Sequence, residues 1–154
     1  MLKSFRWIGL IIVAGSIAAC QTTPPFTCQP SEIGREYPLG SPAYSFTSVW
    51  FTNADKSLWA GVQAEVNEPV ARFKFKPGTE WKMMWWLGDG SAFQDALVVH
   101  AHRLDIQATE ATGYGKAVGP DQRSVALILP SAGCWEVTST ANDHAVTFVM
   151  ELTP

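Results

Sequence analysis

The sequence lacks an apolar run long enough to cross a bilayer as a helix. Its N-terminal uncharged stretch, Trp7–Ala19, has 13 residues, and at about 1.5 Å per residue a helix of this length falls short of a roughly 30 Å hydrocarbon core. The length is typical of the apolar region of a signal peptide, and Lys3 and Arg6 supply the positive charges that precede such a region. We therefore predict that residues 1–19 are a cleaved signal peptide.

Positive charge is scarce and forms no run. The chain has 11 Lys and Arg against 14 Asp and Glu, and removing Lys3 and Arg6 with the signal peptide changes its formal charge from −3 to −5. A mildly acidic chain without a basic run argues against nucleic acid or an anionic lipid surface as a partner. The 135 residues that follow residue 19 suit a single domain with its own core.

The signal peptide leads into Ile17–Cys20 (IAAC), an aliphatic residue and two small ones before a cysteine. This pattern looks like the lipobox of bacterial lipoproteins, in which the cysteine thiol takes a diacylglycerol and becomes the first mature residue. We predict that Cys20 is lipidated and that residues 20–27 tether the domain to the cell envelope, because several acyl chains give stable anchoring. Gln21 stands where Asp usually retains a lipoprotein at the inner membrane, so it favours the outer membrane of a Gram-negative cell. The alternatives are an ordinary signal peptide and a short membrane anchor.

Only three cysteines are present, and lipidation of Cys20 leaves Cys28 and Cys134. In an oxidising compartment an even pair indicates a disulfide, with two buried thiols as the alternative. Trp135 and Val137 share one face of an alternating strand, so Cys134 points to the other face. A bridge to Cys28 would therefore cross the outer side of that strand or require a bulge beside it.

A convincing helical period is also missing. Short runs of β-type residues are instead separated by turns that contain Gly, Pro and Asp, which is typical of a sandwich or barrel. Strands are expected near Tyr44–Asn53, Ser57–Glu65, Val70–Lys76, Trp81–Leu87, Ala96–Asp105, Ser124–Leu129, Cys134–Thr140 and Ala145–Leu152. Asn142-Asp143 suits a tight hairpin turn, and Gly113–Gly115 is interpreted as a turn between strands. We predict one all-β domain over residues 28–154.

No nucleophile elbow, other triad motif or calcium-loop spacing occurs in the sequence, so we predict no enzymatic activity and no cofactor. His100 and His102 stand two residues apart on one face of an expected strand, where two imidazoles can share Zn²⁺ or Cu²⁺. His144 is the candidate third ligand. The alternative is a solvent-facing polar pair, and we expect no tight metal site.

Trp81, Trp85 and Trp86 lie with two methionines in one short strand, which makes both faces of that strand apolar. One interpretation is a central strand that is packed on both sides or covered by the N-terminal segment. The other is an exposed aromatic platform for sugar rings, a peptide or a protein partner. The exposure of the indole rings distinguishes the two interpretations.

Several short motifs invite comparison with a known family. They are Cys28, Ser57–Trp59 (SLW), Lys82–Trp86 (KMMWW), Arg103–Asp105 (RLD), Gly113–Gly115 (GYG), Gly133–Thr138 (GCWEVT) and Phe148-Val149 (FV). Over about residues 28–152 they resemble a family of uncharacterised bacterial lipoproteins and secreted proteins. The resemblance implies an immunoglobulin-like antiparallel β-sandwich with a Cys28–Cys134 bridge, and implies no known activity. The chain departs from the family at Leu87, where arginine is usual, and in Ile106–Thr112, which lacks the usual prolines.

These observations favour a lipid-anchored envelope protein with a non-catalytic binding or accessory role. Its partners would be the membrane, through the N-terminal lipid, and a protein or glycan of the envelope. A periplasmic metal-handling protein that uses His100 and His102 is the alternative, and a hydrolase comes third.

Overall fold

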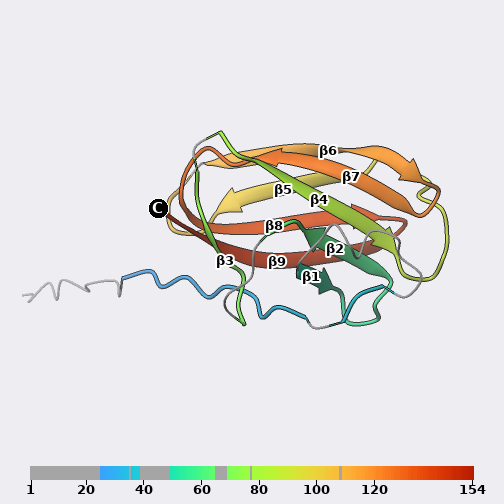
Figure 1. The fold of residues 1–154 in the computed structure, drawn as a ribbon, viewed down its shortest axis with the longest axis horizontal. Helices are drawn as coiled ribbons and strands as arrows, with labels where there is room; N and C mark the ends of the chain where they lie inside the picture. Colours follow the sequence, from blue (N-terminus) through green and yellow to red (C-terminus); the bar gives the residue numbers. More distant parts are fainter. Residues whose placement is uncertain (1–24, 35, 39–48, 65–68, 77, 108) are drawn as a thin grey trace, which may run out of the picture.

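The computed structural model describes residues 25–34, 36–38, 49–64, 69–76, 78–107 and 109–154. The predicted signal peptide, Cys20 and most of the tether lie outside these residues. The described part of the chain contains nine strands (Figure 1) and has no helix that is long and apolar enough to span a membrane. The strands are β1 (Val49–Thr52), β2 (Leu58–Val62), β3 (Arg72–Lys74), β4 (Glu80–Leu87), β5 (Val98–Arg103), β6 (Glu110–Gly119), β7 (Gln122–Ile128), β8 (Gly133–Ala141) and β9 (His144–Thr153). The predicted all-β class is confirmed.

All nine strands belong to one sheet, in the order β1-β2-β4-β7-β6-β5-β8-β9-β3. The sheet curls at β6, because the first half of this strand pairs with β5 and its second half, from Gly115, pairs with β7. The two ends of the curled sheet form facing layers (Figure 1). Neighbouring strands are antiparallel except at one edge, where β3 runs parallel to β9. This parallel pair corrects the expectation of an antiparallel sandwich. The sequence could not reveal it, because side chains alternate between the two faces in the same way in parallel and antiparallel strands.

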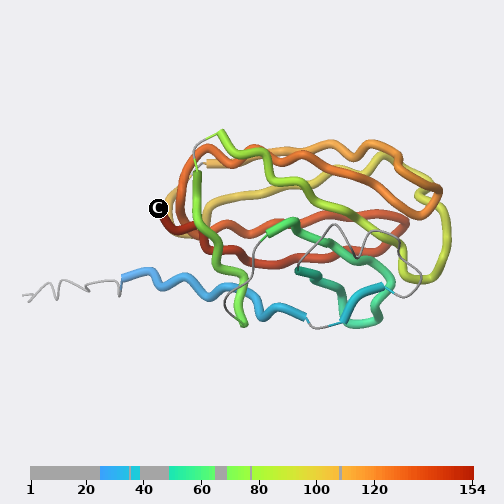
Figure 2. Tube along the Cα trace, in the orientation of Figure 1, coloured from blue at the N-terminus to red at the C-terminus, as the bar shows by residue number. Residues whose placement is uncertain are grey.

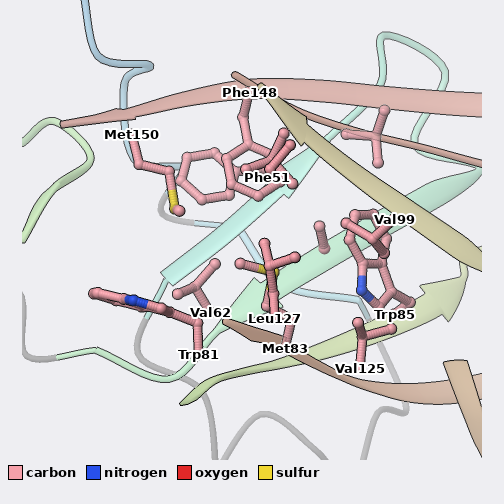
Figure 3. Close-up of a cluster of buried hydrophobic side chains, with 14 of the residues drawn as sticks. Phe51, Val62, Trp81, Met83, Trp85, Val99, Val125, Leu127, Phe148 and Met150 are labelled. Carbon is pink, nitrogen blue, oxygen red and sulfur yellow. The ribbon is translucent and has the colours of Figure 1, made fainter. Parts of the chain in front are cut away.

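The core lies between the two layers and takes alternate residues from each strand. Phe51 of β1 stacks on Phe148 of β9 across the layers, with ring centroids 4.1 Å apart (Figure 3). Trp81 and Trp85 both point inward from β4, and they lie at opposite ends of the cluster shown in Figure 3. The apolar face of β4 therefore runs the length of the core.

Gly113–Gly115 is not a turn, and this expectation is wrong: the three residues lie inside β6. A Cβ on Gly113 would sit 2.6 Å from Cγ1 of Val125, and one on Gly115 would sit 2.8 Å from Cβ of Leu97. These glycines therefore allow close packing at the point where the sheet passes from one layer to the other.

The β8–β9 hairpin turns where the sequence predicts. Asn142 and Asp143 both have positive φ, of 47° and 67°, and Ala141 pairs directly with His144. Positive φ at both central residues gives the turn that matches the twist of two antiparallel strands. The register continues without a shift as far as the start of β8, so no bulge displaces Cys134.

The described N-terminal segment, residues 25–34 and 36–38, links the two edges of the sheet. Ser31 N–H donates to Val149 O of β9 at 2.9 Å, and Ser31 O accepts from Ala71 N–H, just before β3, at 2.9 Å. Gly34 then forms an isolated antiparallel bridge with Trp50 of β1. The segment, blue in Figure 2, thus runs from the β9–β3 edge to the β1 edge.

Candidate functional site

Cys28 and Cys134 are joined by a disulfide, with Cα atoms 5.6 Å apart and a sequence separation of 106. Cys134 lies opposite Glu151 in the regular β8–β9 ladder and is 2% exposed. Its neighbour Trp135 points into the core. The bridge therefore crosses the outer side of β8, the first of the two predicted geometries, and fixes the N-terminal segment beside β8 and β9.

The arginine–leucine–aspartate motif packs at the same corner. Arg103 donates from Nε to Oδ1 of Asp105 at 2.8 Å, from Nη2 to Oδ2 of the same carboxylate, and from Nη1 to Oγ of Ser131 at 3.0 Å. The hydrogen bond from Arg103 lowers the pKa of the Asp105 carboxyl below its ordinary value. Gly133 lies against the guanidinium, where any Cβ would collide with it. Two motifs that carry the family resemblance, Arg103–Asp105 and Gly133–Thr138, thus meet at this corner. The polar side chains there hydrogen-bond to one another.

The three predicted platform tryptophans are buried. Trp81 is 7% exposed, Trp85 0% and Trp86 7%. Trp86 points to the outer side of β4, where it forms a second cluster with Trp50 and Trp59. These three side chains therefore form no exposed platform, and the second half of β4 is packed on both faces. Sequence reasoning missed Trp50 and Trp59 because the pairing of β1, β2 and β4 brings them to Trp86.

The histidines remain separate surface groups. His100 and His102 are exposed on the outer face of β5, and Nε2 of His102 is 3.5 Å from Oε1 of Glu136 on β8. His144 starts β9 at the hairpin, roughly 17 Å along the strand from the position opposite Glu136. In the residues that the structure describes, no group of three or more His, Cys, Asp or Glu side chains is placed to hold a metal ion.

A groove of about 680 Å³ opens between the edge strand β3 and the start of β4. Phe73 and Trp81 line it, with ring centroids 5.5 Å apart and planes tilted by 49°. Arg72, Lys74 and Lys82 also line it. Nε1 of Trp81 is buried and has no acceptor among the described residues. The groove can hold a ligand that combines apolar groups with negative charge.

Sequence analysis named Trp81 only as part of a possible platform, and it predicted neither this groove nor its three cations. The alternation of cations with Phe73 and Phe75 in Arg72–Lys76 was the available signal. It shows that one face of this strand is charged, but not that the strand lies at the edge of the sheet next to the start of β4.

The fold and the groove define an all-β, disulfide-bonded protein with a cation-lined groove. No family model and no curated protein matches the chain. A solved structure from Bacillus anthracis, provisionally described as a lipoprotein, is similar over 68% of this chain and 78% of its own, at 12% identity and a TM-score of 0.44. A likeness at this level identifies neither a family nor an activity.

Proposed function

We propose that the chain is a lipid-anchored extracytoplasmic protein whose β-domain is a non-catalytic binding or accessory module of the cell envelope. The observation that carries the proposal is the sequence of Ile17–Cys20, an aliphatic and two small residues before a cysteine, at the end of a signal-peptide pattern. The Cys28–Cys134 disulfide supports it, because disulfides persist in compartments outside the cytoplasm.

In this proposal residues 1–19 are removed, Cys20 carries the lipid and residues 20–27 form the tether. Eight residues span at most about 30 Å when fully extended, so the domain works close to the membrane surface. Gln21 favours the outer membrane if the cell is Gram-negative. The immunoglobulin-like assignment of residues 28–154 is part of the same proposal, and the two facing β-layers around one core support it.

The groove between β3 and β4 supports a binding role over a catalytic one. Its lining offers cations, an aromatic floor and hydrogen-bond donors, which hold a ligand in place. The metal-handling alternative gains no support from the geometry, since His144 lies far along β9 from the His100–His102 pair.

The anchoring is tested by replacing Cys20. In cells given labelled palmitate, the wild-type protein should be labelled and should fractionate with membranes, whereas Cys20→Ser should take up no label and resist signal peptidase II. Cys28→Ser is the matched control, since it removes a nearby cysteine outside the predicted lipobox and should keep the label. Normal labelling of Cys20→Ser would contradict the proposal.

A further inference from the structure

The groove between β3 and β4 carries an inference that deepens, and rests on, the proposed binding role. Its lining residues include three cations, Arg72, Lys74 and Lys82, against one anion, Glu80. The chain that follows the signal peptide is acidic overall, with a formal charge of −5 after Lys3 and Arg6 are removed. A basic groove in an acidic protein attracts a negatively charged ligand to that place and not to the surface at large.

The cations are concentrated on these strands. Four of the nine Lys and Arg residues that follow residue 19 are Arg72, Lys74, Lys76 and Lys82. Arg72 is engaged by Glu151, with Nε and Oε2 2.6 Å apart, and the Lys74 ammonium donates to Pro154 O at 3.2 Å. Lys82 forms no ion pair with another described residue, so its charge is available to a ligand.

The edge of β3 adds a second kind of recognition. Ala71 O accepts from Glu151 N–H at 2.8 Å, and Phe75 N–H donates to Thr153 O at 2.6 Å, so this set of backbone groups faces β9. Alternate residues of a strand direct their N–H and C=O to opposite sides. Those of Lys74 therefore point away from β9, to the groove side, and no described residue hydrogen-bonds to them. An extended peptide can pair with such an edge as an added strand.

The floor of the groove provides apolar contacts. Phe73 and Trp81 line the groove, and side chains on one face of an added strand would lie on rings of this kind. The Nε1 donor of Trp81 is fully buried, as is that of Trp85 in the core, so neither is offered to a ligand in the groove.

We propose that this groove binds an extended acidic peptide segment of a partner protein, which pairs with the edge of β3 and directs its carboxylates to Lys74 and Lys82. A phosphate group alone would use the cations but leave the strand edge and the aromatic floor without partners. A broad anionic membrane is disfavoured because the rest of the domain is acidic.

The test measures binding of a short fluorescein-labelled peptide of alternating Glu and Val to the full-length protein in non-ionic detergent, by fluorescence anisotropy. The Glu/Val peptide should bind, and the matched Lys/Val peptide should not. Binding should weaken as the ionic strength rises from about 0.01 M to about 0.15 M, since the Debye length falls from about 30 Å to about 8 Å. On binding, the Lys74 amide should exchange its hydrogen more slowly.

The variant Lys82→Glu should bind the Glu/Val peptide about fivefold more weakly, which is the upper range for the loss of one exposed charge pair. Lys116→Glu is the matched control: it makes the same charge change at an exposed site on β6 and should change the affinity by less than twofold. Both variants should keep the wild-type thermal midpoint, since neither side chain is buried.

Equal weakening by Lys82→Glu and Lys116→Glu would overturn the proposal, because it would show attraction by net charge alone. So would equal binding of the two peptides, or unchanged exchange at Lys74. Binding of phosphatidylglycerol vesicles in place of the peptide, lost in Lys82→Glu, would assign the groove to a membrane surface instead. None of these outcomes bears on the labelling of Cys20, so failure of the peptide proposal is distinguishable from failure of the lipid anchor.

Discussion

At the scale of single residues, Gly133 shows how the fold depends on one missing side chain. Its φ of +141° belongs to a region that residues with a Cβ rarely adopt, and the Arg103 guanidinium occupies the place of that Cβ. The same guanidinium is held by Asp105 and Ser131. A substitution at Gly133 would therefore disturb the backbone and the ion pair together.

We expect Gly133→Ala to lower the free energy of unfolding more than Gly90→Ala does. Gly90 also has positive φ, of 74°, but nothing lies within 4 Å of its missing Cβ, so alanine there should cost only the backbone strain of about 1–2 kcal/mol. At Gly133 the displacement of Arg103 should add at least about 1 kcal/mol. Urea unfolding of the two variants measures the difference, and equal losses would show that Arg103 moves aside freely.

At the scale of elements, the second half of β4 is packed on both faces, whereas Glu80 and Lys82 are exposed on the outer face of its first half. Trp85 on the inner face is 0% exposed, while Trp86 on the outer face packs with Trp50 and Trp59. Apolar residues at successive positions are the pattern of a strand covered on both sides. From the sequence alone, this pattern is also compatible with an exposed aromatic platform. The burial of the indole rings shows that they pack inside the domain instead.

Trp85→Ala should therefore destabilise the domain by about 3–5 kcal/mol, as expected for a large aromatic side chain removed from a core. Tyr114→Ala is the control, because Tyr114 is 70% exposed and should change stability by no more than about 0.5 kcal/mol. Chemical denaturation measures both. A fully stable Trp85→Ala protein that has lost a binding partner would instead favour an aromatic platform.

At the scale of the whole molecule, the Cys28–Cys134 disulfide holds the N-terminal segment that links β9 to β1. A bridge that closes a loop of 106 positions contributes at most about 4.7 kcal/mol in the chain-entropy model. This is a large share of a typical net stability of about 5–15 kcal/mol. The segment itself adds hydrogen bonds to both edges of the sheet.

Reduction of the wild-type protein should lower its thermal midpoint clearly. Cys28→Ser should unfold near the midpoint of the reduced wild type and should not respond to reductant, because Cys28 is only partly buried and its replacement removes the bridge with little loss of packing. Calorimetry with and without reductant measures both. Complete reduction without any change in the midpoint would show that the bridge does not hold the segment in place.

The sequence by itself determined the class of the fold and its local features. Alternating residues predict strands because side chains of a strand alternate between faces, and Asn142-Asp143 predicts the hairpin because these two residue types tolerate positive φ. The two cysteines left after Cys20 predicted the bridge that the structure contains. The strand pattern and the hairpin depend on residues close together in the chain. The disulfide could be predicted because only two cysteines remain to pair with each other.

Only the tertiary structure decided how the sheet curls. The sequence predicts a turn at Gly113–Gly115 because glycine weakens a strand pattern. The close packing that requires these two glycines involves Val125 and Leu97, which are distant in sequence. The parallel pairing of β3 with β9, and with it the cation-lined groove beside β4, also depends on contacts between distant segments. Periodicity along a chain specifies which residues share a face, whereas packing of whole strands against one another decides which faces and edges meet.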